Sequence, residues 1–184
     1  WIFGAGVDRL IFREFGSGDN AEDCKCGAFM DLGNPTQERY QELYFAMLEA
    51  VADHLKSNAA WYRHLGYVKP SGANLYSAEN RLPKRCNCAD GCSGEDRMCP
   101  VPRAYRDAPN LTPDGRICNT KVWADAGYTT EGLYRFYDRQ HAVLAKAFPE
   151  KDFAFLLIHD GFPRVGGRND YLACGQKKKV PGLP

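Results

Sequence analysis

Two carboxylates follow segments that have the pattern of β-strands. Asp160 comes just after the apolar run 153–158, in "LLIHDGFP", and Glu79 lies in the loop that leaves the predicted strand 65–69. Acid hydrolysis of a glycosidic bond needs two carboxyl groups beside the bond, one protonated and one ionised. Parallel strands would supply both groups from one edge of a sheet. Glu79 and Asp160 are therefore the candidate catalytic pair, although acidic residues after strands commonly serve as turn formers or helix caps.

Polar and aromatic side chains accompany Glu79 in the stretch "GANLYSAEN". Asn74 and Asn80 could donate hydrogen bonds that orient Glu79 or a sugar hydroxyl. Aromatic faces stack on the apolar faces of sugars, although the same residue types also build protein cores. Trp61 directly follows a predicted helix and is assigned to the core. The aromatic candidates for substrate binding, which lie in or near predicted loops, are Tyr76, Trp123 and Tyr128.

The chain contains eight cysteines, an even number that exceeds ordinary cytosolic use and indicates disulfides. Four of them have the spacing C-x-C-x3-C-x6-C. Zinc sites usually combine two C-x2-4-C pairs, and no histidine lies within this cluster. A metal site is therefore the weaker alternative, and no metal is assigned. The disulfide candidates are Cys24, Cys26, Cys86, Cys88, Cys92, Cys99, Cys118 and Cys174.

Composition and charge exclude several kinds of partner. The chain has 24 basic and 23 acidic residues, so its formal net charge of +1 gives no electrostatic reason to expect nucleic acid. No apolar stretch approaches the roughly 20 residues that cross a bilayer. No glycine-rich loop has the context of a nucleotide site, so no cofactor is predicted. The sequon Asn110-Leu111-Thr112, together with the cysteines, predicts a secreted, extracellular glycoprotein.

Two segments have the pattern of amphipathic helices. In residues 35–56, apolar side chains recur at steps of three and four along the chain. Asn34 is expected to cap this helix. The second helix spans about 130–148, with Thr129 or Thr130 as its expected cap.

The order of the predicted elements is strand, helix, strand, long loop, helix, strand. This order is typical of βαβ units around a parallel sheet, so the sequence predicts an α/β fold. We expect a single domain over 1–184, with a cysteine-rich loop at about 77–127 and a flexible tail at about 166–184. A strand pattern begins almost at once after Trp1, which indicates either a chain from which something was removed or a segment of a longer protein. The three predicted strands are 7–15, 65–69 and 153–158.

Two stretches resemble the middle of a (β/α)8-barrel glycoside hydrolase, namely "YVKPSGANLYSAEN" and "VWADAGYTTEGLYRFYDRQHAVLAKAFPEKDFAFLLIHDGFPRV". The resemblance, which covers about residues 40–165, is to retaining enzymes of a β-galactosidase-like or glycanase-like kind. It implies that Glu79 is a catalytic glutamate at the end of a strand. In those enzymes the glutamate follows an asparagine, whereas here Asn80 follows Glu79. A full barrel takes about 250 residues, so the resemblance implies a partial or reduced TIM-type barrel.

Two hypotheses for function follow from these features. The first is a secreted, carbohydrate-active hydrolase, a glycosidase or a segment of one, with a carbohydrate as substrate or ligand. The second is a non-catalytic, disulfide-rich binding or structural module whose contact surface is the loop 77–127. A second carboxylate about 5–10 Å from Glu79 would favour the enzyme. No feature of the sequence predicts an oligomeric state.

Overall fold

The structure is a computed structural model of the chain, and it divides into two compact units. The first unit comprises 1–9, 33–82 and 128–162, and the second comprises 10–32, 83–127 and 163–184. The interpretation of 1–184 as one domain stays a prediction. The residues that the structure describes are 3–14, 28–73, 82–83, 101–113, 115, 117–155, 162–163 and 165.

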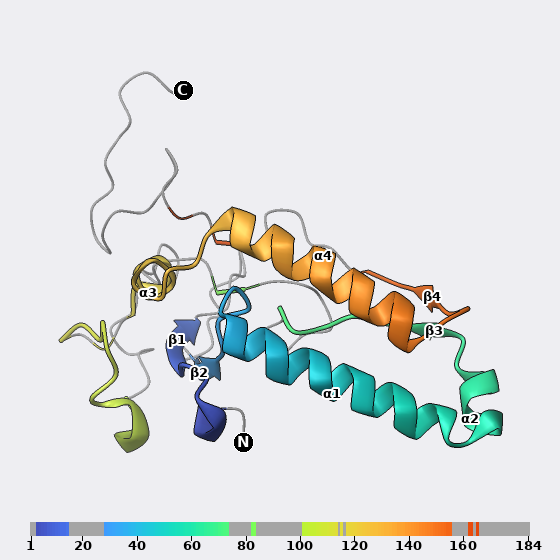
Figure 1. Cartoon of the computed structure of the whole chain (residues 1–184). Helices are drawn as coiled ribbons and strands as arrows, with labels where there is room; N and C mark the ends of the chain where they lie inside the picture. Colours follow the sequence, from blue (N-terminus) through green and yellow to red (C-terminus); the bar gives the residue numbers. More distant parts are fainter. Residues whose placement is uncertain are drawn as a thin grey trace, which may run out of the picture. The chain divides into compact units, whose positions relative to one another are not determined.

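The first unit is built around two long helices that lie side by side (Figure 1). Tyr44 of one helix bonds Gln140 of the other, and further along Glu49 pairs with Lys146. The residue numbers of the contacting pairs increase together along both helices, so the two helices run in the same direction. The elements of this unit are η1 (Phe3–Ala5), α1 (Glu38–Lys56), α2 (Ala59–His64), β3 (Tyr67–Val68), α4 (Thr130–Ala147) and β4 (Asp152–Phe153).

Helix α1 confirms the helix predicted over 35–56, but it begins later. Asn34 was expected to cap the helix, and that expectation is wrong. Its side chain accepts hydrogen bonds from the backbone N–H and the hydroxyl of Thr36. A turn therefore forms first, closed by the N–H of Gln37 donating to the carbonyl of Asn34, and the helix starts at Glu38.

Helix α4 confirms the second predicted helix and its cap. The hydroxyl of Thr129 accepts a hydrogen bond from the N–H of Gly132, which satisfies a donor of the first turn. The helix ends at Ala147, with Phe148 as its C-cap. Pro149 follows, and proline cannot continue a helix.

The core between α1 and α4 changes character along the helices. One end is aliphatic and buries Ala52, Leu144 and Ala147 against Phe148. The other end is aromatic, where the ring of Phe136 contacts those of Tyr40, Tyr44 and Phe45 at centroid distances of 5.8–6.4 Å. The assignment of Trp61 to the core is wrong, because α2 leaves this side chain 54% exposed.

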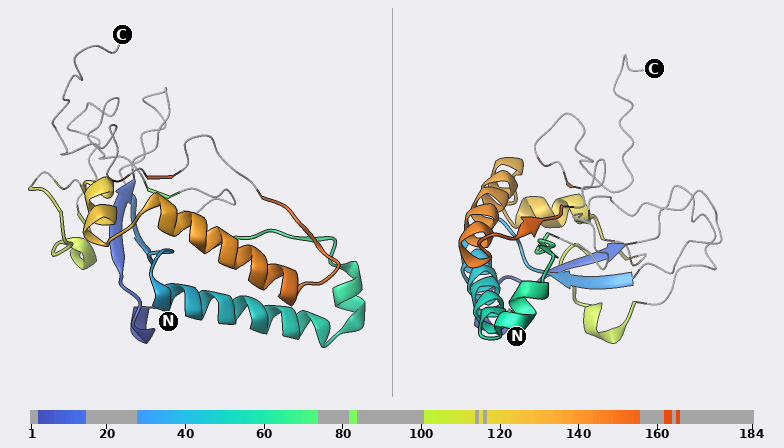
Figure 2. Two further views of the ribbon diagram at one scale, coloured as in Figure 1. Left: turned by 45° about the horizontal axis from the view of Figure 1, so that its top comes forward. Right: turned by 90° about the vertical axis from the view of Figure 1, so that its right-hand side faces the viewer.

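Strands β3 and β4 form a two-stranded parallel sheet, which confirms in part the predicted parallel pairing of strands 65–69 and 153–158. Residues 156–158 of the predicted strand lie outside the described residues. Tyr67 lies opposite Asp152 and Val68 opposite Phe153. Figure 2 shows these strands beside α4, so β3, α4 and β4 form one βαβ unit.

The second unit contains the other sheet, and here the prediction fails. Strand β1 (Leu10–Glu14) was expected in the parallel sheet, but it pairs antiparallel with β2 (Ala28–Leu32). No strand is predicted from the sequence where β2 lies. Antiparallel pairing needs only a local return of the chain, whereas parallel pairing needs a crossover connection. The fold is therefore a mixture of helices and small sheets, and the described residues form no barrel.

The predicted loop 77–127 contains regular structure among its described residues. Helix η4 spans Arg103–Tyr105 and helix α3 spans Asn119–Asp125, both in the second unit. Helix α3 packs on β1, with the ring centroids of Trp123 and Phe12 only 4.7 Å apart. Helix α3 has only seven residues, too few to give a sustained period in the sequence. Among the described residues, no helix has the length and apolar character of a membrane span.

Candidate functional site

The candidate site lies where the chain leaves the parallel strands of the first unit. The N–H of Ala154 donates to the carbonyl of Val68 over 3.0 Å, which extends the pairing beyond β4. Because the strands are parallel, the segments that follow them leave from one edge of the sheet. The predicted site residues on these segments lie outside the described residues, namely Asn74, Tyr76, Glu79, Asn80 and Asp160.

A hydrogen-bond network holds the segment that leaves β3. The hydroxyl of Tyr44 donates to the carbonyl of Ser71 over 2.8 Å, and that of Tyr40 donates to the carbonyl of Gly72 over 2.7 Å. The side-chain amide of Gln140 donates to the Ser71 carbonyl over 2.6 Å and to the Tyr44 hydroxyl over 2.9 Å. Both long helices therefore fix the backbone at the start of the segment that leads to Glu79.

Gly72 is required by both conformation and space. Its φ of +93° lies in the left-handed region, which residues with a side chain rarely adopt. A Cβ atom here would also stand 2.7 Å from the tip of the Tyr44 ring. The backbone thus approaches the ring as closely as a glycine allows, and the two carbonyls come within reach of the tyrosines.

Burial sets the protonation of these tyrosines. It raises the pKa of Tyr40 well above the usual value, and the neighbouring Tyr44 raises it further. Burial also raises the pKa of Tyr44, partly offset by its hydrogen bonds to Ser71 and Gln140. Both hydroxyls therefore keep their protons at neutral pH and act as hydrogen-bond donors.

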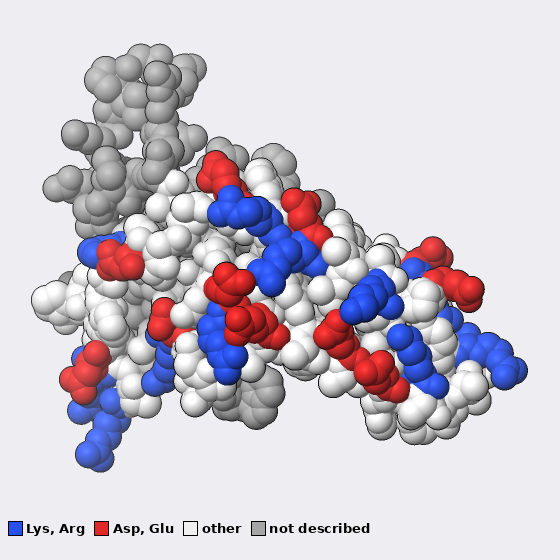
Figure 3. Space-filling view, viewed as in Figure 1, with Lys and Arg blue, Asp and Glu red and all other residues white. Residues whose placement is uncertain are grey.

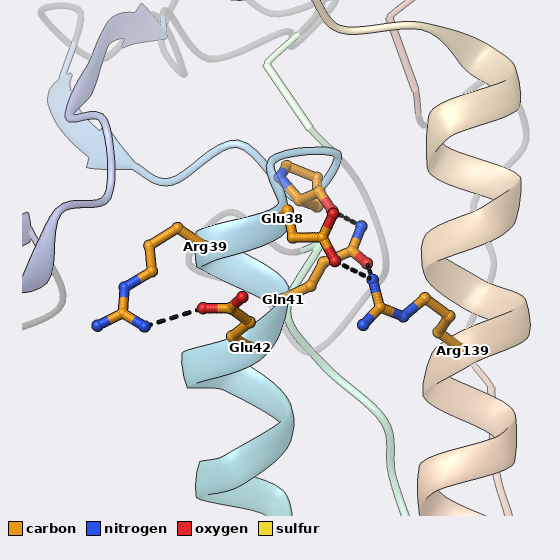
Figure 4. Close-up of polar contacts among 6 residues, drawn as sticks. Glu38, Arg39, Gln41, Glu42 and Arg139 are labelled. Atoms are coloured by element: carbon orange, nitrogen blue, oxygen red, sulfur yellow. Dashed lines mark hydrogen bonds and ion pairs between the residues drawn. The ribbon is translucent and has the colours of Figure 1, made fainter.

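A second set of polar contacts ties α4 to the first turn of α1 (Figure 4). The amide of Gln41 donates to the carbonyl of Pro35 over 2.8 Å and accepts from the guanidinium of Arg139 over 2.6 Å. The same guanidinium lies 3.6 Å from the carboxylate of Glu38. Because the side chains of Arg139 and Glu38 are exposed, this ion pair contributes little to the free energy of unfolding. The buried amide of Gln41 therefore positions α4 against the first turn of α1.

On the face drawn in Figure 3, the charged side chains of the described residues form no single-sign surface. Figure 3 shows acidic and basic side chains interspersed over α1 and α4. Pairs such as Arg39 with Glu42, at 2.8 Å, and Lys146 with Glu49, at 3.8 Å, join opposite charges. This pattern favours solubility, and the face shown does not have the basic stripe of a nucleic-acid interface.

Trp123 and Tyr128 were expected to bind substrate, and the structure places both in a core. Trp123 is 0% exposed in helix α3, and its indole N–H donates to the carbonyl of Pro83 over 2.6 Å. Tyr128 is 1% exposed just before α4. Neither ring offers an exposed face to a sugar, so burial does not favour these two assignments, which stay predictions. Burial of a large aromatic side chain is favourable, and it holds both residues in a core although they were predicted to lie in or near loops.

Cys118 is the one cysteine among the described residues. It is buried before α3 and takes part in a disulfide. The other seven cysteines lie outside the described residues, so the connectivity stays a prediction.

Asn110, the glycosylation candidate, lies in a turn with φ of +64°. Its side chain hydrogen-bonds Asp125, and the pKa of that carboxyl is lowered, mainly by Lys121. An asparagine adopts this left-handed conformation more readily than most residues. Glycosylation at this position stays a prediction.

Sequence reasoning missed the network of Tyr40, Tyr44 and Gln140. A signal was present, since Gln140 is a polar residue within the apolar stripe of the second predicted helix, four residues from both Phe136 and Leu144. A buried polar side chain of this kind must find partners.

Within the described part of the chain, no group of three or more histidine, cysteine, aspartate or glutamate side chains could hold a metal ion. Comparison of the chain with protein-family models, curated proteins and solved structures finds no match in any of the three.

Proposed function

We propose that this chain is a carbohydrate-active hydrolase, or a segment of one, that uses Glu79 and Asp160 as its two carboxylates. The observation that carries the proposal is the parallel pairing of β3 with β4. Glu79 follows the first of these strands and Asp160 follows the second. Parallel strands present their carboxyl ends at one edge, which is where α/β enzymes gather their catalytic groups.

The hydrogen-bond network supports the proposal, because it fixes the position of the backbone that leads to Glu79. Catalysis requires groups held close to the productive geometry, and sites on rigid elements meet that need best. Tyr40, Tyr44 and Gln140 anchor the backbone at Ser71 and Gly72, a few residues before Glu79. In the proposed enzyme, Glu79 donates the proton to the leaving oxygen and Asp160 remains ionised. The βαβ unit would then be part of a reduced barrel.

The test is hydrolysis of a panel of aryl glycosides by variants of both carboxylates. Glu79→Gln should lose about 10²–10⁴-fold in rate, because general acid catalysis is removed. Asp160→Asn should also lose activity. Asp138→Asn is the matched control, since it removes an exposed carboxylate from α4. Full activity of Glu79→Gln, with normal folding by circular dichroism, would end the catalytic assignment.

A second candidate function is a non-catalytic, disulfide-rich binding or structural module. It is favoured by the burial of Trp123 and Tyr128, two of the three aromatics expected to bind a sugar. It is also favoured by the disulfide at Cys118. The module predicts binding of carbohydrate or protein without turnover. An unmodified chain that hydrolyses no glycoside, yet binds an immobilised glycan, would support this candidate.

We also propose that the protein is secreted, with its cysteines paired and Asn110 glycosylated. Intact mass spectrometry of the natural protein tests this, because reduction and alkylation reveal each bridge as a mass change. At least two disulfides are expected within the set Cys24, Cys26, Cys86, Cys88, Cys92, Cys99 and Cys118. Treatment with a peptide N-glycosidase should remove the glycan from the natural protein but have no effect on an Asn110→Gln variant. Eight free thiols in the natural protein would contradict the proposal.

A further inference from the structure

Two buried polar atoms on helix α4 have no hydrogen-bond partner in the part of the chain that the structure describes. They are Oε1 of Gln140 and the hydroxyl of Tyr137. Gln140 is fully buried, and the hydroxyl of Tyr137 has almost no exposed surface. A buried polar atom without a partner costs about 1–3 kcal/mol, so each such atom needs an explanation, of which a bound water, ion or ligand group is one.

The orientation of the Gln140 amide is fixed by its other end. Its NH₂ group donates to the Ser71 carbonyl over 2.6 Å and to the Tyr44 hydroxyl over 2.9 Å. A flipped amide would place two acceptor oxygens against each other at Ser71. The unpartnered atom of Gln140 is therefore an acceptor, and the group that satisfies it must donate a hydrogen bond.

Tyr137 lies on the same face of α4, because residues three apart in a helix are neighbours. Its ring is held edge-on by Phe155 and Phe162, on the segment that follows β4, at centroid distances of 6.4 and 5.9 Å. Burial raises the pKa of Tyr137, and the nearby Tyr128, Tyr44 and Tyr40 raise it further. Its hydroxyl is therefore a proton donor on the same face of α4 as Gln140.

The group that binds both atoms must accept a hydrogen bond from Tyr137 and donate one to Gln140. A carboxylate accepts from Tyr137 but has no proton to donate to Gln140. An ammonium ion would carry an uncompensated charge into a buried place, at a large cost in desolvation. A hydroxyl group is neutral, small, and both donates and accepts.

We propose that Gln140 and Tyr137 together bind one hydroxyl oxygen, which accepts a hydrogen bond from the tyrosine and donates one to Oε1 of the glutamine. The oxygen belongs either to a buried water or to a hydroxyl of a sugar. Only the sugar source rests on the function proposed above. The water source stands even if the chain hydrolyses nothing.

Thermal unfolding of four variants tests the proposal in solution, namely Tyr137→Phe, Tyr134→Phe, Gln140→Met and the double variant Tyr137→Phe/Gln140→Met. If the oxygen is bound, Tyr137→Phe removes a hydrogen bond and should lower Tm by several degrees. If nothing binds, the same change removes an unsatisfied hydroxyl and should raise Tm or leave it unchanged. Tyr134→Phe is the matched control, a tyrosine on the same helix whose side chain is 64% exposed, and it should leave Tm unchanged. Tyr137→Phe should have little effect in a Gln140→Met background, because the bridge is already lost.

A crystal structure with ordered solvent, determined without sugar and after soaking in galactose, identifies the source. An oxygen within hydrogen-bond distance of both atoms in the sugar-free crystal establishes water. An oxygen that belongs to galactose after soaking, together with a galactose-dependent rise in Tm that Tyr137→Phe abolishes and Tyr134→Phe keeps, establishes a sugar hydroxyl. A direct bond between Tyr137 and Gln140, or no oxygen in either crystal, overturns the proposal. Neither result changes the outcome of the Glu79→Gln assay.

Discussion

The two units use buried polar side chains in different ways. In the first unit, neutral hydroxyls and an amide on two long helices hold the carbonyls of Ser71 and Gly72. In the second unit, the charged side chain of Arg13 is 1% exposed, donates to the carbonyl of Gly115 and lies 4.8 Å from the centre of the Phe29 ring. Regular helices support the first network, whereas a short hairpin and a disulfide accompany the second.

The small sheet of the second unit depends on side-chain contacts from a helix. The side chain of Asn119, at the start of α3, exchanges two hydrogen bonds with the backbone of Arg13, accepting over 3.3 Å and donating over 3.2 Å. The side chain of Asn119 thereby satisfies two backbone groups of β1 that a third strand could otherwise bond. An isolated two-stranded hairpin is marginally stable, so the side chains of α3 supply what further strands would otherwise provide.

The largest effect should come from the core of the second unit. Trp123→Ala removes a fully buried ring that packs on Phe12, and we expect a loss of about 3–5 kcal/mol in the free energy of unfolding. Denaturant unfolding measures it. Trp61→Ala is the matched control, because this tryptophan is largely exposed and should change stability by no more than about 0.5 kcal/mol. Equal losses in both variants would show that α3 contributes no special packing.

A smaller effect is expected at the network of the first unit. Gly72→Ala adds a strained backbone and a clash with the Tyr44 ring, and should cost about 1–3 kcal/mol. Gly6→Ala separates the two causes, since Gly6 also has positive φ but has open space around it. It should cost about 1 kcal/mol, from backbone strain alone. If Gly72→Ala costs no more than Gly6→Ala, the close approach to Tyr44 is not a constraint.

The smallest effect on stability is expected at alkaline pH, where the buried tyrosine hydroxyls of the first unit can lose their protons. Tyr40 and Tyr137 have pKa values raised by burial above the usual value of about 10. Their contribution to stability is therefore complete below about pH 10 and is lost as the pH rises toward the folded pKa values. Stability, measured by urea unfolding, should fall from about pH 10 upward.

Single substitutions assign this alkaline fall to its residues. Tyr40→Phe should reduce its slope, since one buried proton is no longer linked to folding. Tyr134→Phe, on the exposed face of α4, should keep the slope of the unmodified chain. An unchanged slope in Tyr40→Phe would mean that the fall arises elsewhere.

The sequence was most informative where hydrophobic periodicity was long. Helices α1 and α4 have 19 and 18 residues, and their apolar stripes predicted both of them. The predicted cap of α4 was Thr129 or Thr130, and Thr129 takes that place. The pairing of β3 with β4 followed from the alternating order of elements. Strand β2 and helix α3 have five and seven residues, and their positions depend on distant partners such as Arg13.

The site was less predictable than the fold, for a physical reason. Aromatic residues suit both sugar stacking and burial, so type and position in the sequence did not separate the two roles for Trp123 and Tyr128. Tyr44 and Gln140 act on backbone carbonyls, which every residue has, and no spacing in the sequence marks Ser71 as their target. Glu79 and Asp160 stay predictions because they lie outside the described residues.

The shared direction of α1 and α4 has an electrostatic consequence. In Figure 1 both helices begin at the same end of their pair, so their dipoles add instead of cancelling. Each helix N-terminus carries the equivalent of about half a positive charge. Strands β3 and β4 run the opposite way, and their carboxyl ends point toward this positive end. The first unit therefore has a built-in electric field that lowers the energy of negative charge at the end toward which both strands run.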